Sequence, residues 1–213
     1  GYYRFSATDY AGNDTGYYYL YYDPVLPEGH IRLKDGTELE NGANVNEAFV
    51  FDATDNIGVK EVKVKRPGSA DYITYTDTMS LTTDGEYSFY CVDTAGNRSE
   101  TYTVVLDTTP PKLTCSGGSF SGTTDKTFTV SASDVGGAVL FYKTSEMTSF
   151  VRAEDDTYTV NDTSDNGVYW FYAEDGLGNR SERVWVELKV ENPVLEIVRG
   201  ENNSVYITWD GEY

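Results

Sequence analysis

The chain of 213 residues is acidic and rich in aromatic side chains. It carries 16 lysines and arginines against 35 aspartates and glutamates, a formal net charge of −19. Nucleic acids and anionic membrane surfaces repel such a charge, which excludes both as partners. Aromatic residues make up 15% of the chain, more than an unfolded acidic segment carries, so a folded protein is expected. No apolar run reaches the roughly 18 residues that cross a bilayer, and we expect no membrane insertion.

Two sequence motifs recur along the chain. The first reads GYYRFSATDYAGN at residues 1–13, GEYSFYCVDTAGN at 85–97 and GVYWFYAEDGLGN at 167–179. The second, FVFDATD at residues 49–55, returns as FTVSASD at residues 128–134. Two motifs in the same order and at near-equal spacing indicate a tandem repeat with a period of about 80 residues.

Each repeat predicts short β-strands in chain order. Tyr87, Phe89 and Cys91 occupy every second position, the period that is typical of a half-buried strand. A turn around Gly96 follows, and the alternation resumes after it. The sequence DTTPP at residues 107–111 ends the unit, because proline cannot continue a central strand. About seven short strands in each unit predict an all-β fold of antiparallel sandwiches.

The repeat divides the chain into four segments. Residues 26–109 and 110–192 are two full copies, residues 1–25 match the last two strands of a copy, and residues 193–213 match the opening strands of another. We therefore expect a fragment of a longer array. Unpaired strands at both ends predict head-to-tail self-association through the terminal hairpins, and the alternative is that each hairpin packs on its neighbouring repeat.

The pattern F-x-A-x-D-x-x-G-N at residues 5–13, together with DTTPP, resembles the bacterial immunoglobulin-like repeats of cell-surface proteins. The resemblance implies tandem Ig-like β-sandwiches in an elongated array. It also implies an extracellular location, at the cell surface or secreted, and a non-catalytic role as a spacer or adhesive segment. The expected partner is a protein or glycan at the cell surface, whose identity the motifs do not indicate.

Residues suited to catalysis are scarce. The chain has one histidine and two cysteines, which excludes a metal centre rich in either residue. Cys91 and Cys115 fall in different repeats, each at an inward position, so we expect two separate buried thiols and no disulfide. No serine or cysteine motif surrounds His30, and we expect the protein not to be an enzyme.

Aspartates gather at the predicted turns. They begin the turn of the first motif or stand at and near the end of the second, as Asp9, Asp52, Asp55, Asp93, Asp134 and Asp175. Calcium prefers such oxygen ligands, but no segment carries the full spacing of a calcium-binding loop. The alternative is that each aspartate accepts hydrogen bonds from its own turn. We therefore expect no cofactor, with calcium as the one candidate.

Outward-facing aromatic residues form the most specific candidate site. The alignment pairs Trp170 with Trp185 on the outer face of the last full copy, next to Tyr172. The first segment has an equivalent row, made of Tyr17, Tyr19 and Tyr21. Such rows predict a carbohydrate-binding accessory module as the alternative function, since flat rings stack on sugars. The same rings also stabilise hairpins as cross-strand pairs, which would be a purely structural role.

Overall fold

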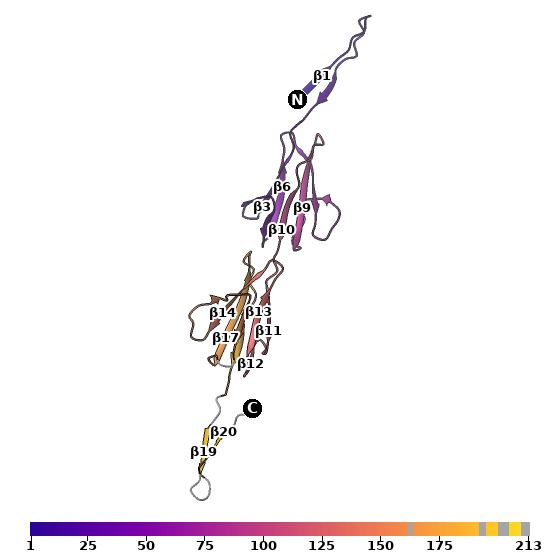
Figure 1. The fold of residues 1–213 in the computed structure, drawn as a ribbon. Coiled ribbons are helices and arrows are strands. Elements are labelled where there is room, and N and C mark those ends of the chain that lie inside the picture. Colours follow the sequence, from indigo (N-terminus) through magenta and orange to yellow (C-terminus); the bar gives the residue numbers. More distant parts are fainter. Residues whose placement is uncertain (162–163, 192–194, 200–204, 210–213) are drawn as a thin grey trace. The chain divides into compact units, whose positions relative to one another are not determined.

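The computed structural model describes residues 1–161, 164–191, 195–199 and 205–209. The chain divides into two compact units, Gly1–Thr109 and Pro110–Tyr213. The described residues form strands and turns and contain no helix (Figure 1). It follows that none of them forms an apolar helix of bilayer-spanning length. The prediction of an all-β fold is confirmed.

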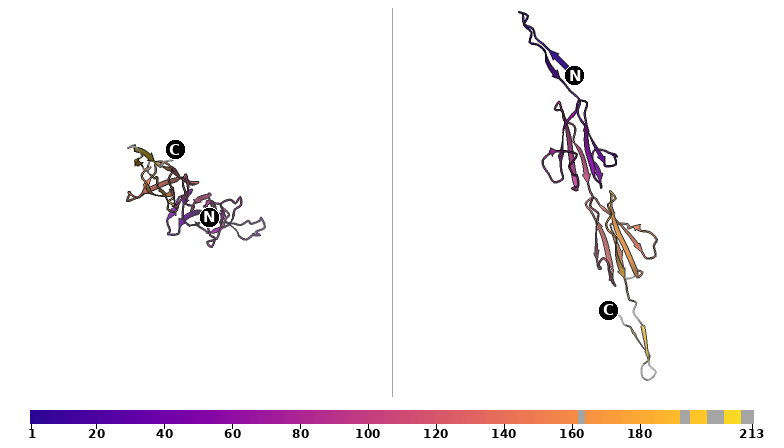
Figure 2. Two further views of the ribbon diagram at one scale, coloured as in Figure 1. Left: turned by 90° about the horizontal axis from the view of Figure 1, so that it is seen from below. Right: turned by 180° about the vertical axis from the view of Figure 1, so that it is seen from behind.

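The first unit contains a sandwich of a small and a large sheet. The small sheet has the order β4-β3-β6 and the large sheet has the order β5-β10-β9-β7-β8. Their bounds are β3 (Glu28–Leu33), β4 (Glu38–Leu39), β5 (Ala43–Val45), β6 (Phe49–Thr54), β7 (Val59–Lys65), β8 (Ile73–Thr74), β9 (Gly85–Asp93) and β10 (Tyr102–Leu106). The two layers can be followed in Figure 1 and from behind in Figure 2.

The second unit repeats this sandwich with one change. Its sheets have the orders β11-β13-β16 and β12-β18-β17-β14-β15. The bounds are β11 (Lys112–Ser116), β12 (Gly122–Thr124), β13 (Phe128–Ser133), β14 (Ala138–Thr144), β15 (Val151–Arg152), β16 (Thr157–Val160), β17 (Gly167–Asp175) and β18 (Val184–Leu188). Both units are Ig-like β-sandwiches, because two layers of mostly antiparallel strands enclose one core and sequential strands switch between the layers.

The change concerns the third strand of the small sheet. In the second unit β16 has the alternating sequence Thr-Tyr-Thr-Val and pairs with β13. The corresponding residues 76–84 of the first unit lack this alternation and form no strand, and Leu81 from this stretch is buried in the core instead. There the third strand is β4, which pairs with the other edge of β3.

The first stretch of chain in each sandwich supplies strands to both layers. In the first unit β3 belongs to the small sheet, while β5 crosses over and pairs in parallel with β10, the last strand of the sandwich. In the second unit β11 and β12 divide in the same way, and β12 pairs in parallel with β18. One stretch of chain therefore ties the two layers of each sandwich together.

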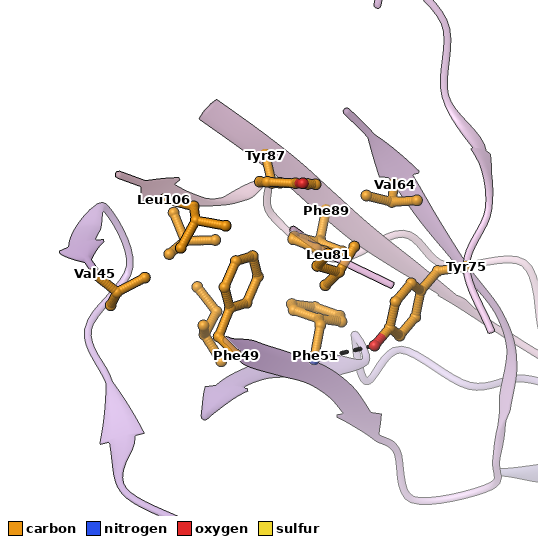
Figure 3. Close-up of a cluster of buried hydrophobic side chains, with 11 residues drawn as sticks. Val45, Phe49, Phe51, Val64, Tyr75, Leu81, Tyr87, Phe89 and Leu106 are labelled. Atoms are coloured by element: carbon orange, nitrogen blue, oxygen red, sulfur yellow. Dashed lines mark hydrogen bonds between the residues drawn. The ribbon is translucent and has the colours of Figure 1, made fainter. Parts of the chain in front are cut away.

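Aromatic rings fill the core of the first sandwich (Figure 3). The Phe89 side chain is fully buried and stacks on Phe51, with ring centroids 4.5 Å apart and planes 5° apart. The Phe51 backbone N–H donates to the Tyr75 hydroxyl at 3.5 Å, a bond that Figure 3 also draws. The inward positions predicted from the alternation are all buried, with exposures of at most 5% for Tyr87, Phe89, Tyr169 and Phe171. The predicted phase of these strands is therefore confirmed.

The second sandwich has its own core around Phe171, which contacts the rings of Phe128 and Tyr158. Cys115 packs against this core, whereas Cys91 is buried in the first unit. Both thiols are free, as the sequence predicted, but Cys115 is only half-buried, so the expectation of a buried thiol is confirmed for Cys91 alone. Burial raises the pKa of each thiol, which keeps both in the less reactive protonated form.

Two hairpins flank the sandwiches. Strands β1 (Tyr2–Phe5) and β2 (Tyr18–Tyr21) pair antiparallel near the beginning of the chain. Strands β19 (Leu195–Arg199) and β20 (Val205–Trp209) pair in the same way near its end. Only Ile197 and Val205 have described side chains in the last hairpin, and both are exposed. The remainder of the predicted opening-strand segment lies outside the described residues.

Candidate ligand-binding surface

The predicted aromatic row of the second unit lies on the outer face of its large sheet. Trp170 on β17 pairs with Trp185 on β18, the register that the alignment predicted. Residues on either side of Trp170 along β17 point into the core, so Trp170 and Tyr172 point outward. All three side chains are half-buried, so neighbouring groups cover part of each ring.

Tyr172 is held by groups of its own unit. It stacks on Phe141 with centroids 4.8 Å apart and planes 2° apart, and Phe150 meets it edge-on at 4.9 Å. The Arg180 guanidinium lies 5.6 Å from the Tyr172 centroid, a cation–π contact. Because these partners already cover Tyr172, little of its ring is left to stack on a ligand.

The two tryptophans differ in their surroundings. The Lys143 ammonium group lies 5.9 Å from the Trp170 ring centroid. Within the part of the chain that the structure describes, Trp185 makes no ring or cation contact. Of the three predicted residues, Trp185 therefore has the fewest ring and cation contacts within the described residues.

The first unit has an equivalent stack that sequence reasoning missed. Tyr90 meets Tyr72 with ring centroids 4.9 Å apart, and the Arg98 guanidinium lies 3.8 Å from the Tyr90 centroid. Tyr90 and Arg98 hold the repeat positions of Tyr172 and Arg180. The sequence signal was present, since an arginine follows the Gly-Asn turn in both copies and an aromatic residue precedes the short edge strand. A stack that recurs in both units stabilises the sheet edge.

The tyrosine row of the first hairpin is much more open. The register places Tyr2 opposite Tyr21 and Arg4 opposite Tyr19, as the alignment predicted. The side chains of Tyr17, Tyr19 and Tyr21 are 57%, 57% and 50% exposed. The opposite face of the hairpin is exposed as well, through Tyr3, Phe5, Tyr18, Leu20 and Tyr22. This hairpin therefore presents exposed aromatic groups on both faces, although the Arg4 guanidinium lies 4.3 Å from the Tyr17 ring centroid and the Tyr2 ring lies 5.4 Å from that of Tyr19.

The single histidine bridges neighbouring strands. His30 Nδ1 lies 2.8 Å from a Glu38 carboxylate oxygen, and His30 Nε2 lies 3.1 Å from the Thr54 hydroxyl. An acid, an imidazole and a hydroxyl thus stand in the order of a catalytic triad. The adjoining pocket, of about 300 Å³, is lined by four glutamates, Glu28, Glu38, Glu40 and Glu100. These carboxylates would repel the oxyanion that acyl transfer creates, so the contacts of His30 serve to connect β3, β4 and β6.

Three carboxylates meet at one end of the first sandwich. One oxygen each from Asp23, Asp55 and Asp93 lies within 4.8 Å of the other two. Asp23 precedes the sandwich, Asp55 follows β6 and Asp93 ends β9. Sequence analysis identified Asp55 and Asp93 but missed Asp23, although an aspartate recurs 84 residues later as Asp107. The three aspartates are far apart in the sequence and come together only in the folded chain.

Each of these aspartates also stabilises a turn. Asp55 Oδ2 accepts hydrogen bonds from the backbone N–H groups of Ile57 and Gly58, at 2.8 and 3.0 Å. The Asp93 carboxylate accepts from the backbone and side-chain N–H groups of Asn97, at 2.8 and 2.7 Å. The turn passes through Gly96, whose φ of 94° suits glycine. The predicted turn-capping role is therefore confirmed for Asp55 and Asp93.

The Asp93 carboxyl is ionised at neutral pH. Burial raises the pKa of Asp93, but the hydrogen bonds from Asn97 and the turn backbone outweigh burial and leave the pKa below its ordinary value. Asp175, which holds the same position in the second copy, is affected in the same direction and by the same balance. The end of β9 therefore carries a buried negative charge.

Comparisons with known proteins give fold-level likeness only. No family model matches the sequence, and no curated protein matches it. Among solved structures, the fibronectin(III)-like modules of Clostridium thermocellum CbhA are 14% identical over 76% of this chain and 94% of that chain, with a TM-score of 0.33. The four N-terminal Ig domains of Dscam1 are 11% identical over 80% and 47%, with a TM-score of 0.42. The FN1–FN3 domains of chicken CNTN1 are 14% identical over 86% and 76%, with a TM-score of 0.32.

Proposed function

We propose that this chain is a non-catalytic spacer or adhesive segment of a bacterial protein that is secreted or displayed at the cell surface. The observation that carries the proposal is the recurrence of one outer-face stack in both units. Tyr90 is covered by the Tyr72 ring and the Arg98 guanidinium. Tyr172 is covered by the rings of Phe141 and Phe150 and the Arg180 guanidinium. A surface that is repeated and already covered belongs to a structural module rather than to a binding site.

The charge of the chain supports the same proposal. A net charge of −19 repels anionic surfaces, so it favours a protein or glycan as partner. The acidic pocket beside His30 supports a role without catalysis, because four glutamates line it.

A binding screen on a glycan array tests the proposal. We expect the natural chain to bind no glycan through the outer face of its second unit. Trp185→Ala is the decisive variant because Trp185, among the described residues, makes none of the ring or cation contacts that cover Tyr172. Thr103→Ala is the matched control, since Thr103 holds the same repeat position in the first unit. A specific glycan signal that Trp185→Ala abolishes and Thr103→Ala preserves would refute the spacer role for this face.

A carbohydrate-binding module is the second candidate, and the exposure of the first hairpin favours it. The side chains of Tyr17 and Tyr19 are each 57% exposed, with ring centroids 6.4 Å apart. Neighbouring open rings on one hairpin face provide a platform for consecutive sugar units. In the same array Tyr19→Ala should remove binding. Tyr18→Ala, on the opposite face, should preserve it, and equal effects of the two variants would exclude this platform.

A further inference from the structure

We propose that Asp23, Asp55 and Asp93 of the first unit bind a calcium ion. The three side chains converge on one point, because one carboxylate oxygen from each residue lies within 4.8 Å of the others. An ion held 2.3–2.6 Å from each ligand, as calcium is, fits among oxygens at these separations. Carboxylate oxygens are the ligands that calcium prefers, and calcium completes its shell of six to eight with carbonyls and water.

Buried carboxylate oxygens of Asp23 and Asp55 give a second, separate indication of a bound cation. Among the described residues, Asp23 Oδ2 and Asp55 Oδ1 are buried and accept no hydrogen bond. Asp23 is only 6% exposed, and its other oxygen accepts from the Val25 backbone N–H at 3.1 Å and from the Asn56 side chain at 3.3 Å. A buried carboxylate oxygen without a partner is unfavourable. A cation at this position would supply the missing partner to both.

The negative charge of the three carboxylates also favours a cation. None of the ion pairs among the described residues involves Asp23, Asp55 or Asp93. Three close carboxylates without a cationic neighbour repel one another, and a divalent cation removes this repulsion. Asp23 and Asp93 are nearly inaccessible, whereas Asp55 is half-buried, so the ion would enter past Asp55.

The turn bonds explain why the cluster exists only in the folded chain. The Asn97 side chain donates to the backbone carbonyl of Asp23 at 2.9 Å and to the Asp93 carboxylate at 2.7 Å. One asparagine therefore fixes the segment that enters the sandwich against the end of β9. Since the unfolded chain lacks this arrangement, calcium would bind the folded unit and stabilise it. The repeat also places aspartate at the three equivalent positions of the next copy, Asp107, Asp134 and Asp175.

Alkylation of Cys91 tests the site in the full chain. Cys91 is fully buried in the first unit, so its rate of labelling by N-ethylmaleimide, followed by peptide mass spectrometry, reports opening of that unit alone. Rates are compared in EDTA and in 10 mM calcium. At the affinities of extracellular calcium modules, about 10⁻⁴–10⁻³ M, calcium should slow labelling by about 10- to 100-fold.

Two variants remove a ligand and keep the turn. Asp23→Asn and Asp55→Asn each retain a carbonyl oxygen that can accept the same backbone hydrogen bonds. In both variants calcium should change Cys91 labelling by less than twofold, and labelling in EDTA should be no faster than in the natural chain, because repulsion is relieved. Asp35→Asn is the matched control: Asp35 accepts from the Thr37 backbone N–H at 2.8 Å in another turn of the same sandwich, and the calcium response should persist.

Three outcomes would overturn the proposal. The first is that 10 mM calcium leaves Cys91 labelling of the natural chain unchanged. The second is that Asp23→Asn or Asp55→Asn keeps the full calcium response, since this would show a purely turn-stabilising role. The third is a response to magnesium as strong as that to calcium, which would contradict the assignment of the ion. None of these results depends on the spacer or adhesive role proposed above.

Discussion

Replacing Phe89 by alanine should destabilise the first unit more than Phe171→Ala destabilises the second. Both side chains are fully buried and hold the same repeat position, so the two variants remove equal apolar area. Truncating a buried phenylalanine costs about 3–5 kcal/mol. The two phenylalanines differ in their contacts with other aromatic rings, and this difference makes Phe89→Ala the more destabilising variant.

Phe89 contacts four aromatic rings, with centroid distances of 4.5 Å to Phe51, 5.6 Å to Tyr75, 6.3 Å to Phe49 and 6.4 Å to Tyr87. Among the described residues, Phe171 contacts two, Tyr158 at 6.1 Å and Phe128 at 6.4 Å. Each aromatic pair adds about 0.5–1.5 kcal/mol beyond area burial. Two additional pairs place Phe89→Ala near 5 kcal/mol and Phe171→Ala near 3 kcal/mol.

Urea unfolding with two probes measures both values in one chain. Trp170 and Trp185 lie in the second sandwich and the first unit contains no tryptophan, so changes in their fluorescence report the second unit and not the first. Alkylation of Cys91 follows the first unit. Phe89→Ala should shift the Cys91 transition and leave the fluorescence transition in place, and Phe171→Ala should do the reverse. A Phe89→Ala cost below about 2 kcal/mol, or a shift of both transitions by either variant, would refute the assignment of two separate aromatic cores.

Two further predictions concern pH and association. Burial, with additional effects of Tyr142 and Tyr169, raises the pKa of Tyr158 to about 12. The folded unit therefore keeps a proton that the unfolded chain loses near pH 10, so unfolding free energy should fall between pH 10 and about 12. Tyr158→Phe should flatten this loss in urea titrations at pH 9–12, and an unchanged slope would contradict the assignment. The exposed terminal hairpins should drive concentration-dependent association in light scattering, and a strict 23.7 kDa monomer at high concentration would argue against it.

Strand phase and hairpin register were predictable because they depend on local periodicity. The alternation through Tyr87 and Phe89 fixes which side chains point inward, and the turn length then fixes the opposite partners, including Trp170 and Trp185. The replacement of the third small-sheet strand by β4 was not predicted. The missing alternation at residues 76–84 is visible in the sequence, but the pairing of β4 with the other edge of β3 depends on which strands lie side by side in the folded sheet.

The carboxylate cluster was only partly predictable, because it combines local turn motifs with a contact between distant parts of the chain. Asp55 and Asp93 are identifiable as turn residues from their motifs. Their proximity to Asp23 requires the entering segment to lie against two turns that are distant in sequence. The hydrogen bonds of Asn97 to Asp23 and Val25 create this contact, and no periodicity indicates them.

The parallel pairing of β5 with β10 has a mechanical consequence. The chain runs into β5 at its first residue and leaves β10 at its last. Because the two strands are parallel, tension along the chain pulls β5 and β10 in opposite directions along the strand axis. The load is shared by all hydrogen bonds between them at once, from Gly42 N–H to the Thr103 carbonyl at 2.8 Å through Asp107 N–H to the Val45 carbonyl at 2.9 Å. A hairpin pulled from its open end would lose its bonds one at a time. Since β12 and β18 repeat the arrangement, we expect both units to resist unfolding when the chain is stretched.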